Sequence, residues 1–338
     1  MNKKKNICVI GAGWFGCHIS LSLIEKGHKV EILEKENNIF LGSSGFNQFR
    51  LHRGYHYPRS DTTISEIKKN FIKFERKYKK FIYFPKKNFY CIAKEKSLID
   101  SGTYKKILKA NKIFVKESKS TQFSNIEKVF ESNEGVIKNF KIINYYKKKL
   151  KKNIVFNKEI KNSDLEKIKK RYDYVIDCTN NTLLNIFKNK TKFILTFSVI
   201  YKSIKGKKNF PITIMDGSLP SLYPYADKKE YFILTHSKYT HLKKFNTFLD
   251  LQNYKSKIKH AACLKIIKKM QKSIEFFYNE FNKNLKYQNY FFSYKVLPSE
   301  KSAKREMAIN IKDNLISVTS PKIANIFSFE EKIFKIIE

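Results

Sequence analysis

The sequence predicts an α/β protein with two domains, one built on a parallel sheet and one on a mixed or antiparallel sheet. A glycine-rich turn joins a short apolar segment to a helical pattern near the N-terminus. Short segments rich in β-branched and aromatic residues recur between residues 193 and 235. The chain has 338 residues, and single hydrophobic cores usually stop growing below about 300 residues. We therefore expect a discontinuous first domain with an α+β domain inserted into it.

The composition is that of a folded chain with a large positive charge. Hydrophobic residues make up 42% and aromatic residues 15%, which argues against disorder. The net charge of +39 arises from 69 Lys and Arg against 30 Asp and Glu, and alone it would suggest a nucleic acid or an anionic membrane. Because the excess is mostly lysine spread along the chain without a recognisable nucleic-acid motif, we expect no specific nucleic-acid partner.

Cysteine spacing and hydropathy limit the remaining classes. The five cysteines include no CxxC pair, so neither a disulfide framework nor a metal site is expected, and a reducing cytoplasm fits best. No stretch reaches the roughly 20 apolar residues that span a bilayer. Peripheral membrane association and the number of subunits stay open.

The first 34 residues predict a strand, a helix and a second strand. The strands are expected at residues 6–10 and 28–34, with the helix at 17–26. A complete GxGxxG lies between the first strand and the helix, and it consists of Gly11, Ala12, Gly13, Trp14, Phe15 and Gly16. This arrangement is the Rossmann-type dinucleotide fingerprint.

Each residue type in the fingerprint has a physical role. Gly11 permits the tight turn, Gly13 lets the backbone approach a pyrophosphate, and Gly16 lets the helix pack against the strand. The N-terminus of the helix offers free N–H groups to the phosphates. Glu34, followed by Lys35, would accept hydrogen bonds from the adenosine ribose and would repel a 2′-phosphate. NAD and FAD are therefore favoured over NADP.

Residues 41–60 follow the second strand without another helix and strand. They include the small-residue loop with Ser43, Ser44, Asn47 and Gln48. This segment resembles the D-amino-acid oxidase-like superfamily of FAD-dependent oxidoreductases, in which such a loop runs under the flavin. The resemblance implies FAD as the cofactor. The continuation His52-x-Gly54-Tyr55-x-Tyr57-Pro58 is most similar to the L-2-hydroxyglutarate oxidase branch, where such a run lies beside the isoalloxazine.

Three further segments resemble cofactor-contacting parts of this superfamily. Residues 153–160 would form a strand that contacts the adenine, with Ile160 at its end. Residues 172–179 would form a strand whose end, with Cys178, Thr179 and Asn180, meets the cofactor. Asn180 and Asn181 replace the usual glycine, and Asn tolerates positive φ better than most residues. A strand at 315–318 and a helix at 323–337 would bring Lys322, Ile323 and the helix N-terminus to the flavin pyrimidine.

The resemblance also implies a division of the chain. Residues 1–75, 135–192 and 300–338 would form the FAD-binding domain, and residues 76–134 and 193–299 the substrate domain. Within the latter the patterns predict an alternating stretch at 81–93, strands at 193–201, 210–215, 221–225 and 230–235, and one or two long helices within 251–284.

Two histidines and two arginines are the candidate catalytic residues. An imidazole titrates near neutrality, so His52 and His56 are the natural bases. Arg50 and Arg305 offer a bidentate fork for an anionic substrate. Hydrogen bonding within the loop for the histidines, and surface salt bridges for the arginines, are the structural alternatives.

These patterns lead to the hypothesis of a FAD-dependent oxidoreductase that oxidises a small amino or hydroxy acid by hydride transfer to flavin. A flavin-dependent nucleotide-sugar mutase, which uses reduced FAD without net redox change, is a first alternative. A cationic binding protein that merely retains the fold is a second.

Overall fold

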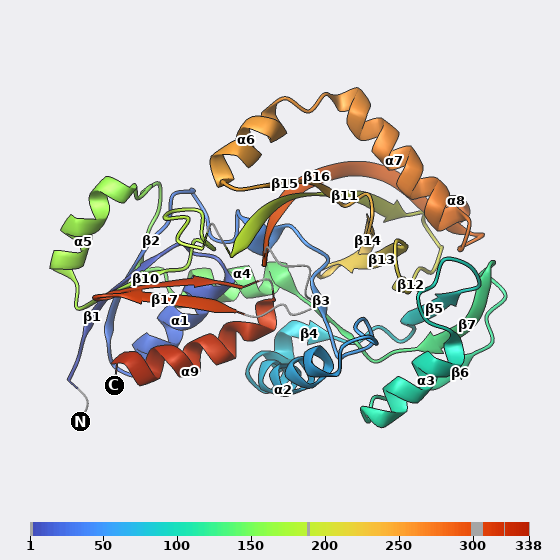
Figure 1. The fold of residues 1–338 in the computed structure, drawn as a ribbon, viewed down its shortest axis with the longest axis horizontal. Coiled ribbons are helices and arrows are strands. Elements are labelled where there is room, and N and C mark those ends of the chain that lie inside the picture. The colour runs from blue at the N-terminus through green and yellow to red at the C-terminus, as the bar shows by residue number, and fades with distance from the viewer. Residues whose placement is uncertain (1–2, 188–189, 299–306, 321, 338) are drawn as a thin grey trace.

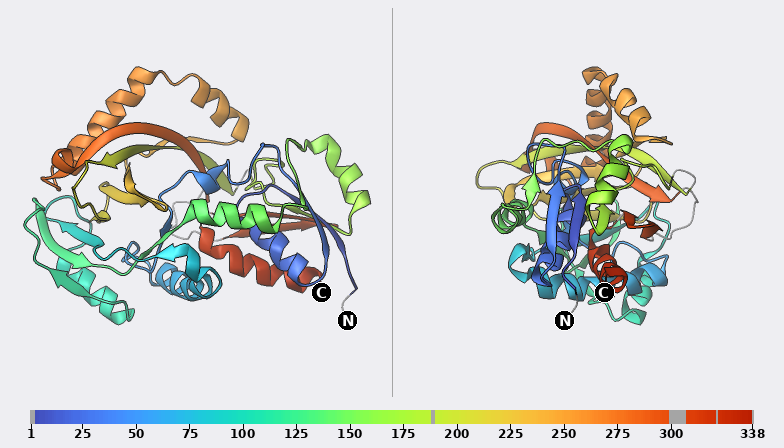
Figure 2. Two further views of the ribbon diagram at one scale, coloured as in Figure 1. Left: turned by 180° about the vertical axis from the view of Figure 1, so that it is seen from behind. Right: turned by 90° about the vertical axis from the view of Figure 1, so that its left-hand side faces the viewer.

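The computed structural model describes residues 3–187, 190–298, 307–320 and 322–337. Figure 1 shows two principal sheets, with the parallel one and its helices on the left and a strongly curved one on the right. The two lie side by side in Figure 1 and in the left-hand view of Figure 2. None of the helices in the described part of the chain combines the length and apolarity needed to cross a bilayer.

The first sheet has six strands in the order β17-β18-β10-β1-β2-β9. Its neighbouring strands are parallel, apart from the antiparallel edge strand β17. The strands come from three separate stretches of chain. They are β1 (Asn6–Ile10), β2 (Lys29–Leu33), β9 (Ile154–Val155), β10 (Tyr174–Asp177), β17 (Ala308–Lys312) and β18 (Leu315–Thr319).

Strand β1 is apolar throughout because both of its faces are covered. Ile7 and Val9 pack into a core with α1 (Trp14–Glu25) and α9 (Ile326–Ile337). Cys8 and Ile10 point to the opposite face and pack near α5 (Leu165–Arg171). Alternate residues of a strand face opposite sides, so a continuous apolar run is what a buried parallel strand requires.

The second sheet has nine strands and carries the longest strands among the described residues. Its order is β15-β11-β14-β13-β12-β5-β7-β6. Strand β16 also pairs with β11, along the whole length of that strand. The strands are β5 (Phe89–Ala93), β6 (Lys116–Ser118), β7 (Ile126–Glu131), β11 (Thr191–Ser203), β12 (Ile212–Met215), β13 (Pro220–Tyr225), β14 (Lys228–His236), β15 (His241–Phe245) and β16 (Leu285–Pro298).

Helix α7 (His260–Glu275) covers one face of this curved sheet (Figure 1). Its buried residues Cys263, Ile267, Met270 and Ile274 recur at helical spacing and pack against the strands. The other α-helices are α2 (Asp61–Tyr78), α3 (Ser101–Ala110), α4 (Asn139–Lys149), α6 (Phe248–Ser256) and α8 (Phe281–Asn284).

A small third sheet positions much of the candidate site. It consists of β3 (Arg50–Leu51), β8 (Gly135–Ile137) and β4 (Ile82–Tyr83), with β8 in the middle. In the antiparallel pair of β3 and β8, Arg50 lies opposite Val136 and Leu51 opposite Gly135. The residues that follow β3 therefore run beside those that precede β8.

Several predicted boundaries were wrong. The predicted strand 153–160 is a strand only at Ile154–Val155, because Asn157 takes φ 54° and its N–H bonds the Glu36 carbonyl. The stretch 81–93 splits into β4 and β5. The helical region 251–284 holds the three helices α6, α7 and α8, and α6 begins before it, at Phe248.

The ends of the two Rossmann helices also differ from expectation. Helix α1 begins at Trp14, inside the glycine motif, rather than at residue 17. The C-terminal helix starts as the 3₁₀ turn Ile323–Asn325 and becomes α-helical at Ile326. Both helix N-termini thus point at the carboxyl ends of the parallel strands, where α/β sheets bind ligands.

Candidate active site

A cavity of about 2410 Å³ runs from the carboxyl ends of β1, β2 and β10 to the inner face of the curved sheet. Pockets for single small molecules occupy roughly 300–1000 Å³, so this cavity has room for a dinucleotide and for a second, smaller molecule.

The predicted site residues converge on this cavity. All of the predicted site residues that the structure describes line the cavity, except Ala12 and Gly16, which are buried. The lining residues are Gly11, Gly13, Trp14, Phe15, Glu34, Lys35, Ser43, Ser44, Asn47, Gln48, Arg50, His52, His56, Ile160, Cys178, Thr179, Asn180, Lys322 and Ile323. Arg305 lies outside the described residues.

The glycine motif has the geometry that its residue types demand. Gly11 takes φ 97°, and a Cβ on Gly16 would lie 1.8 Å from the Gly11 carbonyl oxygen. At Gly13, a Cβ would meet the Ser44 Oγ at 3.0 Å. Helix α1 has neither a side-chain cap nor an acidic residue in its first turn, so its N-terminus can take an anionic group. This cradle fits a pyrophosphate.

Glu34 closes the cradle at the end of β2. Its Oε2 accepts a 2.6 Å hydrogen bond from the Ala12 N–H, and its Oε1 accepts one of 3.0 Å from the Glu36 N–H. A carboxylate has about four acceptor sites, so the group remains able to accept hydroxyl donors. Glu34 therefore has the position and chemistry to hold a ribose.

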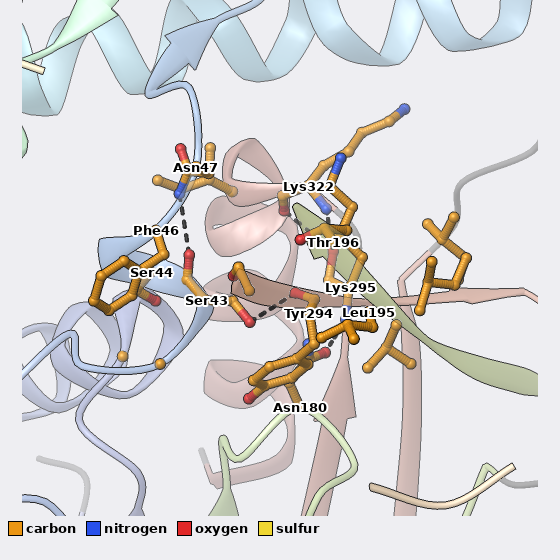
Figure 3. Close-up of a pocket in the computed structure, with 18 of the residues that line it drawn as sticks. Ser43, Ser44, Phe46, Asn47, Asn180, Leu195, Thr196, Tyr294, Lys295 and Lys322 are labelled. Atoms are coloured by element: carbon orange, nitrogen blue, oxygen red, sulfur yellow. Dashed lines mark hydrogen bonds between the residues drawn. The ribbon is translucent and has the colours of Figure 1, made fainter. Parts of the chain in front are cut away.

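The loop after β2 is fixed to helix α1 and to the curved sheet (Figure 3). The hydroxyl of Ser43 donates to the Tyr294 carbonyl of β16 at 3.0 Å, and Asn47 Nδ2 donates to the Ser43 carbonyl at 3.1 Å. The Ser44 Oγ accepts from the Trp14 N–H at 3.0 Å. The loop thus spans from the N-terminus of α1 to the curved sheet and forms one wall of the cavity.

Asn180 ties the ends of β10 and β18 together. It takes φ 58° and its neighbour Asn181 φ 67°, so both occupy the left-handed region expected for residues that replace glycine. The Asn180 Oδ1 accepts from the Thr319 hydroxyl at 2.8 Å and from the Ser320 N–H at 3.3 Å.

Arg50 is a buried cation in the cavity wall. Its Nη2 donates to the Ser221 hydroxyl at 2.5 Å, its Nη1 lies 3.4 Å from the Tyr90 hydroxyl, and the guanidinium carbon sits 4.0 Å from the centre of the Tyr223 ring. Only 8% of Arg50 is exposed. Among the described residues, its buried Nε has no hydrogen-bond partner. Buried donors are nearly always paired, so this nitrogen is available to a bound acceptor.

His52 lies between Glu134 and His56. Its Nδ1 is 3.4 Å from the Glu134 Oε1, and its ring stacks on that of His56 with 5.3 Å between centroids. Glu134 is fully buried. Burial alone would raise the pKa of this carboxyl, but His52, Arg50 and the Tyr90 hydroxyl together hold the pKa below its usual value. Glu134 is therefore a buried anion.

Sequence reasoning missed Glu134, Tyr90 and Ser221. Each belongs to a polar segment or an ordinary strand pattern, with no motif around it. They meet Arg50 and His52 only through strand pairing at long sequence separation. One sequence signal could have pointed to Glu134. Gly135 follows it directly, and a glycine allows neighbouring strands to pack closely. A Cβ on Gly135 would approach the Ile82 Cγ2 to 2.8 Å.

Comparison with known proteins agrees with this geometry. The family model for FAD dependent oxidoreductases, DAO, matches residues 6–263. A curated relative, the FAD-dependent monooxygenase FPY4 of Fusarium mangiferae, is 26% identical over 98% of this chain and 90% of its own length.

Two solved structures show the same fold over almost the full length of both chains. Glycine oxidase from Geobacillus kaustophilus superposes with a TM-score of 0.70 at 8% identity, covering 100% of this chain and 95% of the other. L-alpha-glycerophosphate oxidase from Mycoplasma pneumoniae, solved with FAD bound, gives 0.69 at 13% identity, covering 99% and 95%.

Proposed function

The chain belongs to the DAO family of FAD-dependent oxidoreductases, and from this premise we propose that it oxidises a small organic anion, an amino or hydroxy acid, by hydride transfer to flavin. The observation that carries the proposal is the buried Arg50, with an unpartnered Nε among the described residues, in the wall of the cavity that His52 also lines. Both Arg50 and His52 line this cavity, so the cation and the imidazole border the same space.

The residues divide into a cofactor set and a substrate set. The open N-terminus of α1, Glu34 and the Ser43–Asn47 loop would hold the pyrophosphate, ribose and flavin portions of FAD. When bound, FAD supplies a two-electron acceptor for the hydride. The proposed division is into a cofactor domain (1–75, 135–192, 300–338) and a substrate domain (76–134, 193–299), and it places Arg50 and His52 in the cofactor domain.

Arg50 and His52 would then act on the substrate. Arg50 binds its carboxylate, because a buried guanidinium without solvent competition forms strong charge-assisted hydrogen bonds. His52 takes the proton from the substrate hydroxyl or amine while the hydride leaves the adjacent carbon, so that oxidation leaves a neutral carbonyl or imine. His56, stacked on His52, would support its orientation.

The test is the visible spectrum of the purified protein, first alone and then with candidate substrates under anaerobic conditions. We expect flavin bands that bleach on addition of a small amino or hydroxy acid but not of the corresponding amide, which lacks the negative charge. Passage of the flavin through a filter after denaturation establishes non-covalent FAD. A flavin that no such acid bleaches would contradict the proposal. A nucleotide-sugar mutase would need prior reduction, and a cationic binding protein would show salt-sensitive nucleic-acid binding without turnover.

A monooxygenase reaction is the second candidate, because FPY4 carries that name and aligns with nearly the whole chain. The two reactions differ in the fate of oxygen. Turnover under ¹⁸O₂ incorporates label into the organic product of a monooxygenase. An oxidase or dehydrogenase leaves the organic product free of label. A parallel run in H₂¹⁸O measures the exchange of a product carbonyl oxygen with water, because such exchange would remove label from a monooxygenase product.

A further inference from the structure

We infer that Glu134 is a positioning residue that holds the Nδ1–H tautomer of His52 and thereby presents Nε2 as the basic nitrogen to the substrate. The inference rests on the proposed function for the role of that base, but its geometry stands on its own.

Strand register makes these two residues neighbours. In the antiparallel pair of β3 and β8, Leu51 faces Gly135 and Arg50 faces Val136. One further step along this register brings His52 opposite Glu134, and cross-strand neighbours lie close enough for their side chains to interact. The observed 3.4 Å between Nδ1 and Oε1 agrees with that register.

Both oxygens of the carboxylate are fixed before any substrate arrives. Oε1 accepts a 2.9 Å hydrogen bond from the Arg53 N–H, on the residue directly after His52. Oε2 accepts a 2.6 Å bond from the Tyr90 hydroxyl of β5. The carboxylate therefore cannot rotate away from the imidazole without losing bonds to two separate segments, and hydrogen bonds to a charged group each contribute about 1.5–3 kcal/mol.

The groups around Glu134 keep its carboxylate ionised beside the imidazole. Arg50 lies beyond Glu134 and is linked to it through the Tyr90 hydroxyl. His56 and Tyr57 face His52 from its own loop, at centroid distances of 5.3 and 5.4 Å. Tyr55 and Tyr104 also lie near the carboxylate, and burial followed by its negative charge raises the pKa of both phenols, so both stay neutral.

The arrangement assigns opposite tasks to the two ring nitrogens. A carboxylate only accepts, so the nitrogen that faces it must carry the proton. The other nitrogen, Nε2, then has the lone pair that accepts a proton from the substrate. A 3.4 Å separation is long for a hydrogen bond, and such contacts commonly shorten when the substrate is bound. The negative charge also stabilises the imidazolium that forms.

The tautomer can be measured in the wild-type holoenzyme. Histidine ¹⁵N shifts, recorded on protein with ¹³C,¹⁵N-labelled histidine and assigned by the loss of one spin system in His52→Gln, distinguish Nδ1–H from Nε2–H. We expect neutral His52 to be the Nδ1–H form. A neutral His52 in the Nε2–H form would overturn the inference without any variant of Glu134.

The variant Glu134→Gln tests the charge. Since removal of an adjacent negative charge destabilises the imidazolium, we expect the pKa of His52 to fall by about 1–3 units, measured by the same spectra as a pH titration. The control is Glu131→Gln, at the end of β7, whose half-exposed carboxylate pairs with Lys116 instead. It should leave His52 unchanged. An unchanged His52 titration and tautomer in folded Glu134→Gln would refute the inference.

Activity provides a separate readout. If the proposed oxidation is correct, the acid limb of the pH profile for flavin reduction should move to lower pH in Glu134→Gln by the same interval as the NMR titration. A purely packing role would alter stability or flavin content without this matched shift. If no acid bleaches the flavin while the tautomer still depends on Glu134, the substrate class is wrong and the pairing stands.

Discussion

The carboxylate of Glu34 is bonded to the Ala12 backbone N–H in the middle of the glycine turn, at 2.6 Å. This links the end of β2 to the turn that follows β1. The residue expected from the sequence to hold a ribose therefore also fixes the shape of the pyrophosphate cradle.

Glu34→Gln should weaken FAD binding. Loss of a charged acceptor in a hydrogen bond costs about 1.5–3 kcal/mol, which corresponds to roughly a 10- to 100-fold rise in Kd. Titration of the apoprotein with FAD, followed by flavin fluorescence, measures this change. Glu36→Gln is the control, because its half-exposed carboxylate pairs with the half-exposed Lys35 rather than with the glycine turn. This variant should bind FAD as wild type does. Equal affinity of both variants would show that the Glu34 charge is not used.

Gly16→Ala should prevent formation of the cradle. The added Cβ would lie 1.8 Å from the Gly11 carbonyl oxygen, which is backbone and cannot move aside. We expect protein that is colourless or insoluble, with the flavin-to-protein absorbance ratio as the measurement. The matched control is Gly102→Ala in the first turn of α3, where the nearest atom is a side-chain oxygen of Asp100 at 3.1 Å. A Gly16→Ala holoenzyme with full flavin content would contradict this steric argument.

Local signals were enough to predict the βαβ unit at the start of the chain. The apolar run at residues 6–10, the glycine spacing and the acid at Glu34 are dictated by one continuous βαβ unit, so short-range pattern determines it. At Asn180 the sequence indicated only that asparagine tolerates the positive φ of the usual glycine, and the structure has φ 58° there.

The same reasoning failed for the curved sheet, because that sheet depends on pairing between distant segments. Strand β16 (Leu285–Pro298) was not predicted, because its residues combine lysines with aromatics and alternate only in part. It is a strand because it pairs with β11 along its length. Glu134 was missed for the same reason. Its position beside His52 depends on the register between β3 and β8, and no spacing in the sequence predicts that register.

Arg50→Lys should separate substrate binding from fold. Lysine retains the positive charge but loses the planar fork that stacks on Tyr223 and bonds Ser221. We expect KM for the acid substrate to rise by roughly 10- to 100-fold, in line with about 1.5–3 kcal/mol for a charged hydrogen bond, while flavin content is unchanged. Arg53→Lys is the control, because its guanidinium packs over Phe71, 4.5 Å from the ring centre. A KM that rises equally in both variants would argue against a carboxylate site at Arg50.

His236 should make the folded protein sensitive to mild acid. The residue is 4% exposed; its Nδ1 accepts from the Lys238 N–H at 3.1 Å, and its Nε2 lies 3.1 Å from the Ser273 hydroxyl. Burial, with a smaller contribution from the charge of Lys238, lowers the pKa of His236 to about 4. Protonation of Nδ1 would also break its bond to the backbone. The folded state therefore keeps this imidazole neutral where an unfolded chain would protonate it.

The sign of the resulting pH dependence follows from proton counting. Between the unfolded pKa near 6.5 and the folded pKa of about 4, the unfolded chain binds more protons, so stability falls as pH decreases. From pH 7 to pH 5 the loss due to His236 is about 2 kcal/mol. His236→Gln should be less stable at pH 7 but should show a smaller decrease towards pH 5, measured by urea unfolding of the holoprotein. His18, whose pKa is also lowered by burial, accounts for a remaining slope in the variant. His260→Gln, at an exposed position, should keep the full wild-type slope, and an equal slope in His236→Gln would exclude His236 as a source of acid sensitivity.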